Sequence, residues 1–354
     1  MRYLRWLLFP FSLLYGLVVT VRNWCYDAGI LKSRVFTIPV ICVGNLEVGG
    51  AGKSPMTEYL IRLFKEEHQL ATLSRGYGRE TKGFLVATGT TTAGQIGDEP
   101  AQFKHKFPGI TVAVCEDRVE GIKELRTTHS LIILDDAYQH RRVKPGFSIL
   151  LFDFAKIDEP HLLIPAGNMR EPFSGRWRAE VFIVTKCPPG LSATEQTRIA
   201  DILQPLPFQS LFFTTINYQS LQDLEGKKTD VVLDAGTTVF LLTGIANPLP
   251  LERHIREYTQ NIVHHNYADH HRFTLKNIAK LADEFASCDA QKKVIITTEK
   301  DAARLLEHEL LRAVKKLPIL VMPVATAFLD NSGPQFDNLV KEYVREHSAN
   351  HVIH

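Results

Sequence analysis

The sequence predicts an α/β protein with two domains, each built on a mostly parallel β-sheet. Short, almost entirely apolar runs such as residues 70–74 and 131–134 alternate with segments of helical spacing such as residues 56–67. Strands that are apolar on both faces are typical of a parallel sheet that helices cover on both sides. The 354 residues are enough for two domains of ordinary size.

The alternation of strands and helices runs through the whole chain. In the first half, strands are expected at 36–43, 70–74, 110–115, 131–134, 147–152 and 181–185, and helices at 56–67 and 118–128. In the second half, strands are expected at 239–243, 294–298 and 319–324, and helices at 249–258, 275–285 and 300–308. The polar segment 219–230 is typical of a connection. We therefore expect an N-terminal hydrophobic helix in residues 1–30, a first domain in residues 31–220 and a second, smaller α/β domain in residues 221–354.

Composition excludes some classes of function. Hydrophobic residues make up 45% and charged residues 23% of the chain, as in ordinary globular proteins. The formal net charge of +2 gives no overall signature of polyanion binding, so we expect no nucleic-acid partner. The five cysteines are odd in number and widely spaced, which argues against a disulfide framework or a zinc site.

The N-terminus is unusually apolar. Residues 6–21 contain no charged side chain, and arginines flank them at Arg2, Arg5 and Arg22. The run is short of the about 20 residues that span a bilayer, and Pro10 interrupts it. A thin stripe of polar or small residues at helical spacing consists of Ser12, Gly16 and Thr20. This pattern favours a membrane-associating helix that lies in the bilayer interface, while a buried core helix and a spanning segment or secretory signal are alternatives.

A glycine-rich loop follows the strand at 38–43. The stretch GNLEVGGAGKSP, residues 44–55, leads into the next helix. A strand, a glycine-rich loop, Lys-Ser and a helix form the context of a P-loop, whose backbone N–H groups and helix dipole hold phosphate oxygens. We therefore expect a P-loop NTPase-like, doubly wound sheet. The residues expected to bind nucleotide are Gly49, Gly50, Ala51, Gly52, Lys53 and Ser54.

Two residues of this loop carry specific expectations, and one departs from the standard pattern. Lys53 is expected to reach the β- and γ-phosphates, and the Ser54 hydroxyl to bind Mg²⁺. The standard pattern has glycine where this chain has Glu47. The rest of the loop in its strand–helix setting still predicts nucleotide binding, and a glycine-rich turn with an incidental lysine is the alternative.

Carboxylates and histidines downstream are further candidates. Asp135 and Asp136 end an apolar strand, where P-loop proteins hold Mg²⁺. Asp98 and Glu99 form a second acidic pair, which from spacing alone is either a solvated turn or the carboxylate that a kinase needs beside its acceptor hydroxyl. The segment 269–271, Asp-His-His, is either a base with its partner or a surface turn.

The motifs in their order resemble the tetraacyldisaccharide 4'-kinase family. The matching segments are 44–46 with 49–55, 73–79 (LSRGYGR), 97–100 (GDEP), 134–140 (LDDAYQH), 164–167 (IPAG), 170–172 (REP), 185–188 (TKCP), 269–271 (DHH) and 297–301 (TTEKD). The chain differs from the residues that are usual in this family at three places, and none of these differences removes a charged group. They are Ala51 and Ser54 in place of threonines, Ala137-Tyr138 in place of Gly-Phe, and Asn168-Met169 in place of Pro-Leu.

The resemblance implies a reaction and its residues. It implies two domains that close over ATP and transfer the γ-phosphate to the 4'-hydroxyl of tetraacyldisaccharide 1-phosphate, a step of lipopolysaccharide biosynthesis that gives the lipid A precursor lipid IVA. Asp98 is implied as the catalytic base with His270 as its partner, and Lys53 and Arg118 as stabilisers of phosphate charge. The residues implied for Mg²⁺ are Ser54, Glu99, Asp135 and Asp136, and two more active-site residues are Arg170 and Glu171.

The resemblance also implies a place in the cell, and three other functions compete with it. An acylated disaccharide stays in the membrane, so the enzyme is expected as a peripheral or monotopic protein on the cytoplasmic face of the bacterial inner membrane. The alternatives are a P-loop NTPase, a membrane-tethered nucleotide-binding scaffold and a kinase of a soluble small molecule. A GTPase is disfavoured because Thr185-Lys186 is followed by Cys-Pro and not by the aspartate that reads guanine.

Overall fold

The computed structural model describes residues 7–352, so Arg2 and Arg5 lie outside the described residues. The larger of two sheets has nine strands in the order β13-β8-β7-β6-β1-β5-β2-β4-β3. These strands are β1 (Val40–Asn45), β2 (Leu70–Ser74), β3 (Leu85–Val86), β4 (Thr111–Val114), β5 (Leu131–Asp135), β6 (Phe147–Asp153), β7 (Val181–Thr185), β8 (Ser210–Tyr218) and β13 (Val324–Phe328). All neighbouring pairs are parallel except β3 with β4 and β13 with β8. This confirms the predicted α/β fold with a mostly parallel sheet.

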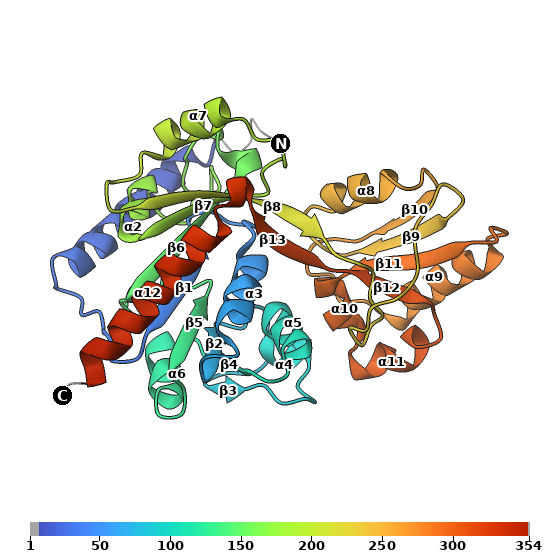
Figure 1. Ribbon diagram of the computed structural model, residues 1–354, viewed down its shortest axis with the longest axis horizontal. Coiled ribbons are helices and arrows are strands. Elements are labelled where there is room, and N and C mark those ends of the chain that lie inside the picture. The colour runs from blue at the N-terminus through green and yellow to red at the C-terminus, as the bar shows by residue number, and fades with distance from the viewer. Residues whose placement is uncertain (1–6, 353–354) are drawn as a thin grey trace.

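Helices cover both faces of this sheet (Figure 1). They are α2 (Phe9–Asp27), α3 (Lys53–Phe64), α4 (Ala93–Ile96), α5 (Asp98–Lys106), α6 (Arg118–Leu125), α7 (Ala193–Leu203) and α12 (Gly333–Val352), with short 3₁₀ turns at Phe154–Lys156, Phe173–Arg178 and Leu329–Asn331. One apolar core joins α3, α5 and α12 to the sheet, and the other joins α6 and α7. Every residue of β1 is buried because β5 and β6 flank it and both faces are covered.

The smaller sheet has four parallel strands in the order β10-β9-β11-β12. Its elements are β9 (Thr238–Thr243), α8 (Leu249–Arg256), β10 (Ile262–Asn266), α9 (Leu275–Ser287), β11 (Lys293–Thr298), α10 (Glu299–Leu305), α11 (His308–Val314) and β12 (Ile319–Met322). Two apolar clusters lie between this sheet and its helices, one with α8 and one with α9, α10 and α11. We call residues 238–322 the second unit, and residues 7–218 with 324–352 the first unit.

The end of the chain departs from the expected division, which gave every residue after 220 to the second domain. Strand β13 pairs antiparallel with β8, and α12 buries Phe336, Val340 and Val344 against the nine-stranded sheet. The apolar run 319–324 therefore divides at Pro323 into β12 and β13, which belong to different sheets. Two connections cross between the units, one after β8 and one before β13 (Figure 1).

Helix α2 lies against the first unit with its small and polar residues facing inward. Ser12, Gly16 and Val19 are buried, whereas Thr20 is exposed. The Ser12 hydroxyl donates to the Leu163 carbonyl at 2.9 Å and accepts from the Ala166 N–H at 2.8 Å. Two of the three residues of the expected stripe, Ser12 and Gly16, thus face the protein, and most apolar side chains of the helix point away from it. Those that are 49–62% exposed are Phe11, Leu13, Leu14, Leu17, Val18, Val21 and Trp24.

Between residues 7 and 352, none of the helices combines the length and the apolar character that a membrane crossing requires.

Candidate active site

The phosphate loop lies at the carboxyl end of β1, in the middle of the large sheet. On one side of β1 the sheet continues with β6, β7 and β8, and on the other side with β5, β2 and β4, so the order of the strands reverses at β1. Open α/β sheets bind ligands at such a switch point. Gly49 has φ 110° and Gly52 has φ 82°, conformations that disfavour any side chain. Helix α3 begins at Lys53, so its N-terminal N–H groups face the loop.

Glu47 occupies the position where the standard P-loop pattern has its first glycine. The backbone of Glu47 forms an isolated antiparallel bridge with Met169, and its carboxylate lies 3.5 Å from the Lys156 ammonium. Lys156 also donates to the Val48 carbonyl at 3.2 Å. The start of the loop is therefore held by a neighbouring segment, and the glycines needed for left-handed backbone remain at 49 and 52.

Asp135 and Asp136 lie together at the end of β5 but differ in their surroundings. The buried Asp135 carboxylate accepts from the Thr57 hydroxyl at 3.0 Å, and burial together with the charge of Asp136 raises the pKa of Asp135 to about 7. Asp136 lies 3.6 Å from the Lys53 ammonium and accepts from Arg170 at 3.0 Å. Burial alone would raise the pKa of Asp136, but the charges of Lys53 and Arg170 outweigh it and lower that pKa.

Arg118 is a buried cation beside these acids. As the first residue of α6 it donates to the carbonyl oxygens of Glu116 at 3.0 Å and Asp136 at 3.4 Å. Its buried Nε has no hydrogen-bond partner among the described residues. A buried guanidinium that is bonded to carbonyl oxygens and keeps a donor free suits an anionic ligand.

Arg170 and Glu171 face in different directions. The Arg170 Nη1 donates to both carboxylate oxygens of Asp136, at 3.0 and 3.2 Å. Glu171 is buried and accepts from Gln139 at 3.0 Å, from Asn23 at 3.3 Å and from Arg178 at 3.1 Å. Arg170 therefore touches the acidic pair, while Glu171 ties α2 to the wall of the site.

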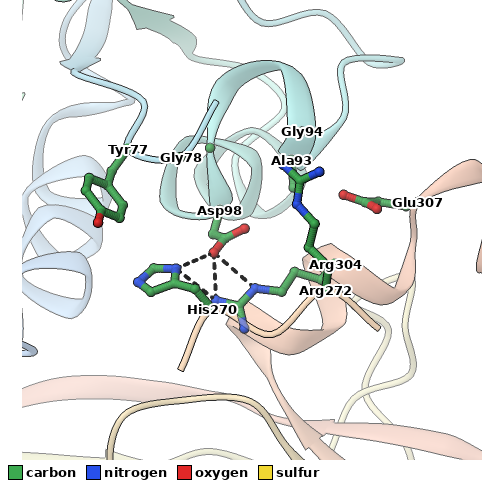
Figure 2. A pocket seen from close by; sticks show the side chains of 10 residues that line it. Tyr77, Gly78, Ala93, Gly94, Asp98, His270, Arg272, Arg304 and Glu307 are labelled. Carbon is green, nitrogen blue, oxygen red and sulfur yellow. Dashed lines mark hydrogen bonds and ion pairs between the residues drawn. The ribbon is translucent and has the colours of Figure 1, made fainter. Parts of the chain in front are cut away.

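The structure brings Asp98 and His270 together across the two units, although 172 positions separate them (Figure 2). The His270 Nδ1 lies 2.8 Å from the Asp98 Oδ2. The same oxygen accepts from Arg304, from Nη2 at 2.6 Å and Nε at 3.0 Å. Burial would raise the pKa of Asp98, but the hydrogen bonds from His270 and Arg304 lower it to about 2. The hydrogen bond to Asp98 raises the pKa of His270.

These residues line a pocket of about 110 Å³. Its lining comes from both units and consists of Tyr77, Gly78, Ala93, Gly94, Gly97, Asp98, His270, Arg272, Arg304 and Glu307. Asp98 is the first residue of α5, and Gly97 before it has φ 94°, with its Cα facing the backbone of residues 76 and 77. A side chain at Gly97 would collide with that backbone, so the glycine sets how Asp98 enters the pocket.

The expected metal ligands are engaged by different partners, although Glu99 lies near enough to Asp135 for its charge to help raise the pKa of Asp135. Glu99 accepts from the Lys300 ammonium at 2.7 Å, whereas Asp135 is bonded to Thr57. Over residues 7–352 no group of three or more His, Cys, Asp or Glu side chains is spaced to hold a metal ion. Mg²⁺ commonly takes one or two carboxylates and completes its shell with phosphate oxygens and water. The acid pair 135–136 beside the phosphate loop fits such a site, because burial and the charge of Asp136 raise the pKa of Asp135 more than the charge of Lys53 lowers it.

Sequence reasoning missed three cations at the site. Arg304 and Lys300 reach Asp98 and Glu99 from α10, and Lys186 reaches the phosphate loop by donating to the Gly50 carbonyl. Lys300 and Lys186 lie in the family motifs at 297–301 and 185–188, and these motifs could have indicated their importance, but no role was predicted for either lysine. Arg304 lies just beyond the first motif, one helical turn after Lys300.

Comparisons with known proteins identify the family of the chain. The family model described as tetraacyldisaccharide-1-P 4'-kinase matches residues 4–345. The tetraacyldisaccharide 4'-kinase of Bacteroides thetaiotaomicron is 41% identical, over 98% of this chain and 94% of its own. That of Flavobacterium psychrophilum is 42% identical, over 99% of this chain and its whole length.

A solved structure shares the fold. The crystal structure of LpxK from Aquifex aeolicus in complex with ATP superimposes with a TM-score of 0.74 and 24% identity, over 96% of this chain and 99% of the other. The match of the family model to nearly the whole chain and the identity to full-length relatives both confirm the resemblance seen in the motifs. The chain belongs to the tetraacyldisaccharide-1-P 4'-kinase family.

Proposed function

We propose that this protein transfers the γ-phosphate of ATP to the 4'-hydroxyl of tetraacyldisaccharide 1-phosphate, which yields ADP and the 1,4'-bisphosphorylated lipid A precursor. The observation that carries the proposal is the contact between Asp98 and His270 across the two units. Glu99, the neighbour of Asp98, lies near enough to Asp135, beside the phosphate loop, for its charge to raise the pKa of Asp135. A nucleotide switch needs the loop and the acids alone. A carboxylate–histidine pair beside them is what transfer to an alcohol adds.

The nucleotide half of the site is assigned to the first unit. Backbone N–H groups of residues 49–52 hold the phosphates, and Lys53 and Arg118 stabilise the negative charge of the phosphoryl group during transfer. Ser54, Asp135 and Asp136 are the candidate Mg²⁺ ligands, and Glu99 joins them only if it leaves Lys300. An ion held by these residues would supply positive charge that neutralises the charge of the phosphates.

The acceptor half lies where the two units meet. In the proposed step the 4'-oxygen bonds to the γ-phosphorus, and the bond from that phosphorus to the bridging oxygen breaks with its electron pair leaving on ADP. The hydroxyl proton passes to the Asp98–His270 pair. Because the low pKa of Asp98 keeps its carboxylate ionised, a group that can accept the hydroxyl proton is present. In a loose transition state the hydroxyl loses its proton late, so a strong base is not required.

The exposed apolar face of α2 suits a membrane surface, which is where an acylated substrate resides. A contiguous apolar helix face turned away from its own protein marks an interaction site. We assign the protein to the cytoplasmic face of the inner membrane as a peripheral or monotopic enzyme, with residues 1–30 as the anchor. We also propose that the chain forms a kinase domain and a second α/β domain with a boundary near residue 220. Residues 324–352 then belong to the kinase domain.

The test is transfer from γ-labelled ATP with Mg²⁺ to detergent-dispersed tetraacyl disaccharide 1-phosphate, with the lipid product resolved. Labelled lipid is expected from the native protein. Losses on the order of 10²-fold or more are expected for Lys53→Ala and for Asp98→Ala, while Asp98→Ala keeps its affinity for ATP. Lys227→Ala, an exposed lysine of the connection, is the matched control and keeps full activity.

The alternative functions give different results in the same assay. Release of inorganic phosphate without labelled lipid would reject the kinase in favour of a P-loop NTPase. Transfer to the sugar portion without acyl chains, at the same rate as to the lipid, would favour a kinase of a soluble substrate. Binding of ATP without either product would favour a scaffold.

A further inference from the structure

The guanidinium of Arg304 is the most constrained cation between the two units. Its Nη2 and Nε both donate to the Asp98 Oδ2, at 2.6 and 3.0 Å. Its Nη1 donates to the Gly244 carbonyl and to the Asp301 Oδ1, each at 2.8 Å. The side chain is only 4% exposed. Exposed ion pairs contribute little, but a buried guanidinium with this many geometric constraints has a fixed orientation.

Residues of the second unit bind the guanidinium of Arg304 on the side that does not contact Asp98. Asp301 is fully buried and accepts from the Thr298 hydroxyl at 2.7 Å and from the Gly244 N–H at 3.1 Å. The guanidinium therefore rests on groups that belong to the second unit, and its free edge faces the first unit. Asp98 is the group that this edge meets.

The contact leaves the two oxygens of Asp98 in different states. Oδ2 receives three donors, two from Arg304 and one from His270. Oδ1 accepts no hydrogen bond from the residues that the structure describes, and in Figure 2 it points away from both partners on the pocket side. Since the fixed guanidinium of Arg304 gives Oδ2 two hydrogen bonds and His270 adds a third, rotation about the Cβ–Cγ bond would break them, and Oδ1 is kept in one position.

The contact also depends on how the units meet. Helices α5 and α10 pack against each other and are joined by three ion pairs, in two of which α5 supplies the acid and in one the base. These are Asp98 with Arg304, Glu99 with Lys300, and Lys106 with Glu299. Movement of the second unit away from α5 would remove Arg304 and His270 from Asp98 together. The orientation of the carboxylate therefore depends on the arrangement in which α10 packs on α5, which we call closed.

We propose that Arg304 is a positioning residue for phosphoryl transfer, which the second unit brings to Asp98 so that Oδ1 faces the acceptor hydroxyl only when the units are closed. The inference rests on the proposed kinase function and adds to it a residue that acts through Asp98. Placing a reacting group correctly is worth orders of magnitude in rate, because a small misorientation removes the near-attack geometry. His270 alone offers one donor, which permits the carboxylate to rotate.

Steady-state kinetics with the full-length protein test this through a double-mutant cycle. The four proteins are the native enzyme, Arg304→Gln, Asp98→Asn and the double variant. Arg304→Gln is expected to lower kcat by about 10- to 100-fold and to change the KM for ATP by less than about 3-fold, since the phosphate loop belongs to the first unit. In the Asp98→Asn background, the same change is expected to cost less than about 3-fold, because Arg304 then has no carboxylate to position.

Two further variants separate positioning from folding. Arg304→Lys keeps the charge beside Asp301 but cannot place two donors on one oxygen, so a reduced kcat with near-native thermal stability is expected. Arg256→Gln removes an exposed arginine of the second unit that pairs with Glu252 and keeps the native kcat.

Each other outcome has a defined meaning. An equal loss from Arg304→Gln in both backgrounds, or loss of ATP binding in both Arg304 variants, would overturn the proposal, because Arg304 would then act independently of Asp98 or only hold the fold. Native kinetics in Arg304→Gln would overturn it while leaving the kinase function intact. If the native enzyme forms no labelled lipid, the kinase function fails first and this inference falls with it.

Discussion

The hydroxyl of Tyr15 donates a 2.6 Å hydrogen bond to the carbonyl oxygen of Arg170, whose guanidinium holds the carboxylate of Asp136. Helix α2 is thus fastened to the segment that carries part of the acidic site. The apolar face of the same helix points away from the protein. A change in how α2 lies on a surface can therefore reach the acids through two consecutive contacts.

Tyr15→Phe is expected to lower kcat by about 3- to 10-fold. A net contribution of about 1 kcal/mol is typical of one hydrogen bond, and its loss lets the Arg170 segment move relative to Asp136. The measurement is kcat with saturating ATP and lipid. Tyr258→Phe, on the second unit, is the control and keeps the native rate. An unchanged kcat in Tyr15→Phe would mean that α2 anchors the segment through Ser12 and Asn23 alone.

Lys186→Met is expected to raise the KM for ATP by about 10-fold and to leave kcat within about 3-fold of native. The Lys186 ammonium donates to the Gly50 carbonyl and pairs with Asp153 at 2.6 Å, so it fixes the outer side of the phosphate loop. Its loss makes the loop pay an ordering cost on binding, which weakens affinity more than chemistry. Lys123→Met, an exposed helix lysine paired with Glu120, is the control. A native KM in Lys186→Met would contradict this role.

Local sequence patterns predicted the central part of the fold well, because there they coincide with the tertiary environment. The apolar runs at Leu70–Ser74 and Val181–Thr185 are strands with the expected bounds, since both faces of the sheet are covered. The run 319–324 divides between two sheets, which no local pattern encodes. β13 continues from β12 with one proline between them, and the partner that decides its sheet is β8, more than 100 residues earlier.

The candidate site shows the same limit. The phosphate loop was predictable because one continuous segment carries its chemistry. The proximity of Asp98 and His270 came from the family resemblance, and Arg304 was missed because its partner lies 206 positions away. The orientation of α2 was not predicted either. The stripe of Ser12, Gly16 and Thr20 favoured an interfacial helix without indicating what the stripe would contact, and in the structure Ser12 satisfies buried backbone groups of the loop at 163–166.

Leu17→Glu is expected to lower binding to vesicles of anionic phospholipid by about 10-fold or more. Leu17 is 61% exposed on the outward face of α2, so a charge there costs little in water but must enter the apolar layer on binding. Co-sedimentation with the vesicles measures the change. The control is Val232→Glu, which replaces a similarly exposed apolar residue away from α2. Equal loss in both variants, or none in either, would remove α2 as the membrane contact.

Glu180→Gln is expected to stabilise the protein at pH 8 but not at pH 4. Burial raises the pKa of Glu180 to about 7 from its ordinary value of 4.5, despite the N–H of Ser148, which donates at 2.6 Å. Between these two values the unfolded chain is ionised while the folded protein keeps its proton, so stability falls as pH rises and the penalty is complete above pH 7. Glutamine can still accept from Ser148 and carries no charge. The gain at pH 8 is expected to be about 2–3 kcal/mol.

Denaturant unfolding of the native protein and the variant across pH 4–8 isolates Glu180 from other groups that titrate in this range. Asp135 also has a pKa raised to about 7 and lowers stability in the same direction, so the pH dependence of the native protein contains both. The difference between the two proteins removes the Asp135 contribution, since it is common to both. Glu124→Gln, an exposed glutamate of α6, should give a difference near zero at every pH. A Glu180→Gln difference that does not grow between pH 4 and 8 would mean that the carboxylate is ionised throughout, with Lys144 as its available counter-charge.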